Sequence, residues 1–116
     1  MPPTTNFEFG DVILVPFPIS NQTAAKHRPA VVISSDAYNR ERLDFVILAI
    51  TSQIRPTLGL GEALVAQWKQ AGLIKPSVLK PVLTTIEKDL VIKKLGRLAT
   101  GDREKLREVL DAILGA

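Results

Sequence analysis

The chain has 116 residues and a formal net charge of +3, with 46% hydrophobic and 23% charged residues. This length fits one domain with a packed core, and the balance of apolar and charged residues excludes a wholly disordered chain. Because there is no cysteine, disulfide frameworks, thiolate zinc sites and cysteine nucleophiles are excluded. No apolar stretch approaches the roughly 20 residues that span a bilayer, and no secretion signal is recognisable, so we expect a cytoplasmic protein without membrane contact.

Short apolar runs predict three β-strands in the first half of the chain, because they are rich in branched side chains and bounded by turn-forming residues. They occupy residues 10–17, 28–33 and 43–50. Residues 1–8 are predicted to be a flexible N-terminal segment, and the polar residues 18–26 predict an exposed, mobile loop that joins the first two strands as a wide hairpin. Pro29 favours an extended conformation at Arg28, so we expect the second strand to open there.

The middle of the chain predicts a loop, a short helical stretch and two further strands. Residues 54–61 contain one proline and two glycines, which is typical of a loop. Residues 66–71 predict one or two helical turns that end at Gly72, with Trp68 docking them on the core. Two more short strands are predicted at residues 76–81 and 91–98, with residues 87–90 as a turn between them.

The C-terminal residues predict one amphipathic helix. Apolar residues recur there with the spacing of a single helix face, at positions 106, 109, 110, 113 and 114. Thr100 is the expected N-cap, Asp102 and Glu104 suit the first turn, and Gly115 ends the helix. The predicted fold is therefore mainly β with a C-terminal α-helix laid against the sheet.

Few side chains could carry catalytic chemistry. His27 is the only histidine, so one chain cannot build a histidine zinc cluster, and the acidic residues lack the spacing of a magnesium site. Neither a dinucleotide-binding nor a Walker-type glycine loop is present. We therefore expect no metal and no cofactor, and any catalysis would depend on charge and positioning.

Arg28 and Thr51 stand at strand ends that would meet if the second and third strands pair antiparallel. A guanidinium and a hydroxyl at one rim suit a phosphate, because arginine binds it bidentately and threonine adds a hydrogen bond. On the residues alone, a structural pairing of Arg28 with an acid explains the pattern equally well. Residues 69–97 carry seven basic and two acidic residues, which favours either a phosphate-facing surface or a solvated one.

Three sequence blocks resemble the signature of the MazF/PemK family of endoribonuclease toxins from bacterial toxin–antitoxin pairs. They read GDVILVPFP at residues 10–18, HRPAVVIS at 27–34 and AITSQ at 49–53. Residues 71–78 and 94–98 resemble the second half of the family pattern. The resemblance implies an SH3-like bent β-barrel of the CcdB/MazF/Kid toxin type, as a single domain over residues 9–116, and a homodimer.

The resemblance also implies functional residues. Arg28 and Thr51 match the catalytic arginine and threonine, and candidates for a general base or for substrate binding follow: Lys26, His27, Ser52, Gln53 and Lys80. Between Lys80 and Thr85, where many relatives have an acidic residue or glutamine, this chain reads PVLT, so its RNA selectivity is expected to differ.

The expected reaction is attack of the RNA 2′-hydroxyl on the adjacent phosphate, which gives a 2′,3′-cyclic phosphate and a 5′-hydroxyl end. Arg28 would stabilise the charge of the phosphorane. His27 titrates in a suitable range for a base, but adjacent residues of a strand point to opposite faces, so only a bend would bring it beside Arg28. Expected partners are single-stranded RNA and a cognate antitoxin with an acidic, partly disordered segment.

Two alternatives place another function on the same barrel. One is a gyrase poison of the CcdB type, and the other is a silenced toxin or plain interaction module that binds protein only. The aromatic residues do not separate these readings, because most lie in or beside apolar runs and are expected in the core: Phe7, Phe9, Phe17, Phe45 and Trp68. Tyr38, in a polar stretch, is the one candidate for stacking on a base.

Overall fold

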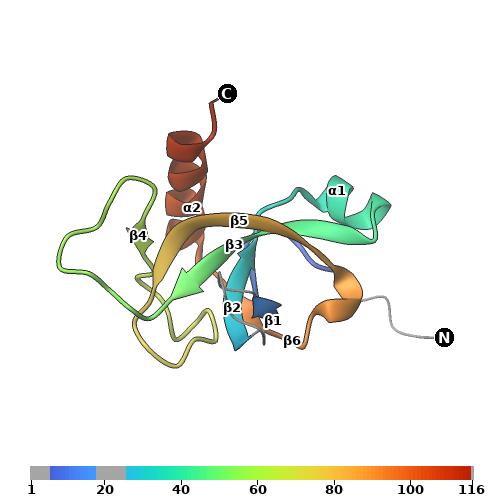
Figure 1. Ribbon diagram of the computed structural model, residues 1–116, viewed down its shortest axis with the longest axis horizontal. Helices are drawn as coiled ribbons and strands as arrows, with labels where there is room; N and C mark the ends of the chain where they lie inside the picture. The colour runs from blue at the N-terminus through green and yellow to red at the C-terminus, as the bar shows by residue number, and fades with distance from the viewer. Residues whose placement is uncertain (1–5, 18–25, 116) are drawn as a thin grey trace.

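The computed structural model describes residues 6–17 and 26–115, which form one strongly curved antiparallel sheet with a helix at each side (Figure 1). The strand order is β4-β5-β3-β2-β1-β6. In chain order the elements are β1 (Asp11–Phe17), β2 (Lys26–Val32), α1 (Asp36–Glu41), β3 (Asp44–Thr51), β4 (Ala63–Leu64), β5 (Val78–Glu87), the 3₁₀ helix η1 (Lys88–Leu90), β6 (Lys93–Arg97) and α2 (Thr100–Ile113). The mainly β fold with a C-terminal helix, predicted from the residues, is confirmed.

Both faces of the central strands are buried, which explains why their sequences are continuous apolar runs without alternation. One face packs against α2 and includes Val12, Val31, Leu48 and Leu106. The other face forms a second cluster that includes Ile13, Val15, Ala30, Ile47 and Phe45. The predicted core positions of Phe7, Phe9, Phe45 and Trp68 are confirmed. The side chain of Phe17 and residues 18–25 of the predicted loop at 18–26 lie outside the described residues. Strand β2 begins at Lys26, two residues before the start predicted at Arg28, because the ladder with β1 extends to the pair Phe17–Lys26.

Strand β5 is longer than the predicted strand at residues 76–81, because Pro81 does not end it. Between the pairs Leu48–Leu83 and Ile50–Leu79, one residue of β3 faces three residues of β5. A bulge of this kind leaves backbone groups outside the ladder, so a proline, which has no N–H to donate, is tolerated there. The chain therefore continues as a strand to Glu87, and the predicted turn at 87–90 is the helix η1 that follows.

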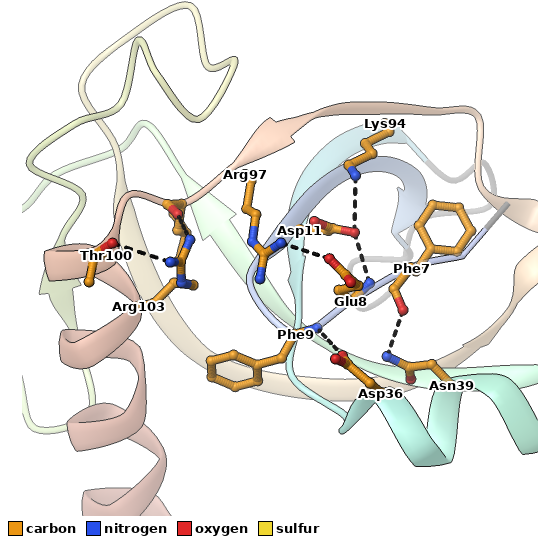
Figure 2. Close-up of polar contacts among 11 residues, drawn as sticks. Phe7, Glu8, Phe9, Asp11, Asp36, Asn39, Lys94, Arg97, Thr100 and Arg103 are labelled. Atoms are coloured by element: carbon orange, nitrogen blue, oxygen red, sulfur yellow. Dashed lines mark hydrogen bonds and ion pairs between the residues drawn. The ribbon is translucent and has the colours of Figure 1, made fainter.

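The N-terminal residues that the structure describes are packed, not free (Figure 2). The Phe7 ring lies 5.0 Å from that of Phe45, and its carbonyl accepts a hydrogen bond from Asn39. Glu8 pairs with Arg97 at 2.7 Å. Residues 1–5 lie outside the described residues, whereas Phe7 and Glu8, the last two residues of the predicted N-terminal segment, contact the folded body.

Asp11 holds the same corner together from inside. Its carboxylate is fully buried, and Oδ2 accepts a hydrogen bond from the Glu8 N–H at 2.8 Å and lies 3.3 Å from Lys94 Nζ (Figure 2). The second oxygen, Oδ1, has no partner among the described residues. The corner thus links the N-terminal residues to β1 and β6 through a buried charge.

The prediction that Thr100 caps the C-terminal helix α2 is wrong. Ala99 occupies the N-cap position and Thr100 is already helical, so Thr100 does not cap the helix. Asp102 lies in the first turn as expected, but its buried carboxylate accepts hydrogen bonds from the backbone N–H groups of Ala66 and Gln67, at 3.0 and 2.8 Å. It thereby fixes the preceding helical turn to α2. The longest helix in the described part of the chain is α2, with 14 residues, and none is long and apolar enough to cross a membrane.

The predicted helical turn at residues 66–71 is present as hydrogen-bonded turns and ends at Gly72. Gly72 has a positive φ of 84°, and the bonds Leu73 N–H to Trp68 O and Gly72 N–H to Lys69 O form a Schellman motif. A Cβ at Gly72 would also lie 2.1 Å from the carbonyl oxygen of Leu95 on β6. Only glycine fits this contact.

Replacing Gly72 with alanine should lower the free energy of unfolding by at least about 3 kcal/mol, because it combines a strained φ with a backbone clash. Urea denaturation followed by circular dichroism measures this. The matched control is Gly101→Ala in α2, where a Cβ meets nothing within 4 Å and alanine should stabilise by up to about 1 kcal/mol. Equal effects of the two substitutions would contradict the packing described.

Candidate active site

Arg28 lies near the start of β2 and Thr51 at the end of β3, the neighbouring antiparallel strand. The β2–β3 ladder is antiparallel, and its pairs run from Val32–Ile47 to Ala30–Ala49. Continuing this register by two residues on each strand sets Arg28 across from Thr51. Both side chains then share the face of Ala30 and Ala49, because side chains two residues apart lie on the same side of a strand. The ladder itself ends at Ala30–Ala49, so the meeting of Arg28 with Thr51 stays a prediction from its register.

Arg28 has apolar neighbours on the sheet. Its pairing partner on β1 is Val15, which is fully buried, and the next residue on its own face, Ala30, is also fully buried. Its Nε is buried and has no hydrogen-bond acceptor within residues 6–17 and 26–115. A buried N–H donor without an acceptor is costly, so this position favours an anionic ligand that supplies one.

The hydroxyl oxygen of Thr51 accepts one hydrogen bond. The N–H of Gln53 donates to Thr51 Oγ1 at 3.1 Å, which turns the chain immediately after β3. Because the oxygen accepts this bond, the hydroxyl proton is available to donate to another group. Ser52 and Gln53 are exposed at the rim of the same site.

His27 and Lys26 separate onto opposite faces. Lys26–Val32 is a continuous strand, and His27 pairs with Pro16 in a regular ladder, so no bend turns its ring toward Arg28. The geometric objection to a histidine base therefore holds. Lys26 lies two residues before Arg28 on the same face and is exposed. Tyr38 is also remote, because α1 precedes β3 whereas Thr51 ends it, and its ring lies 5.3 Å from the Arg42 guanidinium.

The loop that leaves Thr51, residues 52–62, is held by one carboxylate. Glu62 Oε1 accepts a hydrogen bond from the Gly59 N–H at 2.7 Å, and Oε2 accepts one from Arg55 Nη2 at 2.8 Å. These bonds lower the pKa of Glu62, the Gly59 bond most, and the charge of Lys80 on β5 adds to the effect. The sequence did not identify this pair, although Arg55 and Glu62 are the only charged residues of the loop.

Four of the seven basic residues between 69 and 97 have partners among the described residues. Lys94 pairs with Asp11 and Arg97 with Glu8 at the β6 edge. Lys88 donates to the Asn39 carbonyl, and Lys69 lies over the Trp68 ring. Lys80 is exposed on β5, beside the loop that follows Thr51. Among the described residues, no group of three histidine, aspartate or glutamate side chains is placed to hold a metal ion.

The fold matches solved toxin structures at low sequence identity. One is an endoribonuclease in complex with its cognate antitoxin from a Mycobacterial species, with a TM-score of 0.75, 19% identity and coverage of 93% of this chain and 94% of that one. Another is MazE-MazF from Deinococcus radiodurans, with a TM-score of 0.73, 18% identity and coverage of 96% and 98%. A third is the Mycobacterium tuberculosis toxin MazF-mt6, with a TM-score of 0.69, 19% identity and coverage of 88% and 94%.

These structural matches confirm the bent barrel of the MazF type. No curated protein matches the chain significantly. A family model described as PemK-like, MazF-like toxin of type II toxin–antitoxin system matches residues 8–114, which is nearly the whole chain. The chain therefore belongs to the PemK-like, MazF-like toxin family of type II toxin–antitoxin systems.

Proposed function

We propose that this protein is a metal-independent endoribonuclease that cleaves single-stranded RNA, with mRNA as its cellular substrate, in the cytoplasm. The observation that carries the proposal is the buried Nε of Arg28, which lacks an acceptor among the described residues. A phosphodiester supplies the missing acceptor. The structural matches to proteins named as endoribonucleases agree with this proposal.

The chemistry follows from the residues at the site. The RNA 2′-hydroxyl attacks the adjacent phosphate and loses its proton to solvent water, so that the 2′-O–P bond forms as the P–O5′ bond breaks. The leaving 5′-oxygen takes a proton from water and departs as a hydroxyl, and negative charge increases on the non-bridging oxygens of the phosphorane between these two events. Arg28 stabilises that charge with paired N–H donors, and Thr51 orients the same phosphate with its hydroxyl proton. The apolar neighbours of Arg28 reduce water access, which strengthens this interaction. We assign no base role to His27, because it lies on the other face, so charge stabilisation carries most of the rate gain.

The proposal extends to two partners. An antitoxin would cover the site, and two of the matched structures hold a toxin together with MazE or a cognate antitoxin. An acidic segment would be attracted by the exposed cations near the site, Lys26 and Lys80. The homodimer implied by the family resemblance is part of the same proposal, and light scattering of the purified protein measures it.

The test is cleavage of a long single-stranded RNA in excess EDTA. The unmodified protein should give discrete fragments, and Arg28→Ala should give none, because the charged group at the phosphate is removed. A parallel gyrase assay separates the alternatives. Gyrase inhibition without RNA cleavage would overturn the proposal in favour of a CcdB-like poison, and neither activity would indicate a silenced toxin. Cleavage that EDTA abolishes would contradict the metal-independent mechanism.

A further inference from the structure

The loop at residues 52–62 begins directly after the proposed catalytic threonine and ends at β4, two strands away. Thr51 on β3 pairs with Val78 on β5, and Val78 pairs on its other side with Leu64 on β4. The loop therefore leaves the sheet after Thr51 and rejoins it at β4, where Leu64 is level with Val78 and Thr51 across the three strands. Figure 1 shows it projecting from the end of β3 opposite to α1. Any residue fixed within this loop is fixed relative to Thr51.

The end of the loop that carries Glu62 is anchored in the body of the protein. Gly61 is buried, with a φ of 84°, and a Cβ there would lie 3.2 Å from Pro81 on β5 and 3.5 Å from Ile113 on α2. The Glu62 side chain is only 7% exposed. Its two oxygens bind Gly59 N–H and Arg55 Nη2, so a buried carboxylate holds both the backbone of the loop and one guanidinium.

Arg55 is bound through one guanidinium nitrogen, but most of its side chain is open to solvent. Its side chain is 68% exposed, although one nitrogen is bound to the buried Glu62. Of the five N–H donors of a guanidinium, the described contacts use only a donor on Nη2. The Cα of Arg55 lies at most about 14 Å from that of Thr51, four residues earlier, because this is the limit of an extended chain. A second phosphate of a strand bound at Thr51 is within reach.

We propose that Arg55 binds a second backbone phosphate of the RNA strand, and that Glu62 is the positioning residue that orients Arg55 for this contact. This inference rests on the proposed function. A buried acceptor that fixes one edge of a guanidinium leaves the other edge preorganised, which reduces the entropy lost when it binds an anion. An exposed arginine without such support would contribute less.

The charges around Glu62 keep it ionised in the folded protein. Hydrogen bonds from Gly59 and Arg55 lower its pKa, and the nearby cation Lys80 lowers it further. Lys105 and Glu108 of α2 line the same pocket as Glu62 and are the charged groups that α2 contributes to it. Because the folded pKa is lowered, the Glu62 contacts are fully present above its usual range and are lost only as the pH falls through the lowered value. The Arg55–Glu62 pair is therefore intact near neutral pH.

The first test measures how RNA binding depends on salt. The probe is a fluorescein-labelled RNA oligonucleotide that spans a mapped cut site and carries a 2′-deoxy residue there, so that it binds without being cleaved. For Arg55→Gln, the slope of log Kd against log salt concentration should fall by about 0.7, the value for one phosphate contact on a single strand. Arg55→Lys should keep the slope of the unmodified protein, because it keeps the charge.

Arg40→Gln is the matched control, because it removes the same charge from an exposed position on α1. α1 precedes the start of β3 at Asp44, and Thr51 lies at the other end of this strand, about 23 Å away along an extended β3. Its slope should equal that of the unmodified protein. If Arg55→Gln changes the slope no more than Arg40→Gln does, the phosphate contact is overturned.

The second test separates positioning from simple loop stability. Glu62→Gln keeps an oxygen for the Gly59 N–H but removes the charge that holds Arg55. It should raise KM roughly tenfold, the low end for supporting contacts, and leave kcat nearly unchanged. In an Arg55→Gln background the same substitution should have no further effect on KM. An equal effect in both backgrounds would contradict the positioning role.

The two proposals fail in different ways. If the unmodified protein cleaves no RNA, the proposed function fails. If it cleaves RNA and binds the probe, but Arg55→Gln leaves the salt slope unchanged, only the phosphate contact of Arg55 fails.

Discussion

Replacing the 2′-hydroxyl with hydrogen at the nucleotide 5′ to the cut phosphate should reduce cleavage at that position to background. The expected nucleophile is that hydroxyl, and the protein offers no substitute for it at Arg28 and Thr51. The measurement is a single-turnover assay in EDTA with a short RNA that contains one mapped cut site. The products of the unmodified RNA should carry a 2′,3′-cyclic phosphate and a 5′-hydroxyl, which mass spectrometry identifies.

The control RNA carries the same 2′-deoxy substitution two nucleotides away. It should be cleaved at nearly the rate of the unmodified RNA, because the nucleophile is intact and only a peripheral contact changes. Cleavage of the first substrate at an undiminished rate, with 5′-phosphate ends, would show that water and not the 2′-hydroxyl attacks the phosphate.

Arg28→Lys should lower the single-turnover rate by about 100- to 1000-fold, the range for removing a transition-state hydrogen-bond donor. Lysine keeps the positive charge but loses the planar fork that binds two phosphate oxygens. Because the charge remains, the Kd for the uncleavable RNA should change far less than the rate. This split between rate and binding is the signature of a contact that strengthens in the transition state.

The matched control is Arg40→Lys at the exposed end of α1, which should leave both quantities unchanged. Circular dichroism establishes that Arg28→Lys is folded. A variant that is folded and retains the rate within threefold would show that Arg28 does not stabilise the phosphorane.

The positions of the strands could be predicted from the sequence because local patterns determine them. Runs of branched apolar residues mark β1, β2 and β3, and Gly72 marks the end of a helical turn through its positive φ. The antiparallel pairing of β2 with β3 is confirmed, and it brings the start of one strand, with Arg28, toward the end of the next, with Thr51. The separation of His27 from Arg28 follows from strand alternation alone.

The elements that depend on tertiary contacts could not be predicted. Pro81 suggested a strand end, but a bulge opposite Ala49 accommodates it. Asp102 was expected to serve its own helix, whereas it binds two backbone N–H groups that lie 35 and 36 residues earlier. The short helix α1 was missed because residues 36–41 are mostly polar, and its Ser35 cap is visible only once the helix is known.

The candidate site shows the same division. Lys26, Arg28 and Thr51 could be placed from strand periodicity, but the basic residues at 69–97 could not, because Asp11 and Glu8 engage two of them from a distant part of the chain. Glu62 could not be identified from the sequence for a similar reason. The Glu62 side chain is only 7% exposed and accepts hydrogen bonds from Gly59 and Arg55, contacts that no pattern within the loop indicates.

A double-mutant cycle between Arg28 and Thr51 tests directly whether the two residues act on one phosphate. If they do, their effects on the single-turnover rate in EDTA should be coupled. We expect Arg28→Lys with Thr51→Val to be slowed clearly less than the product of the two single effects. Full multiplication of the two effects would show that Arg28 and Thr51 act independently, and would contradict a shared phosphate.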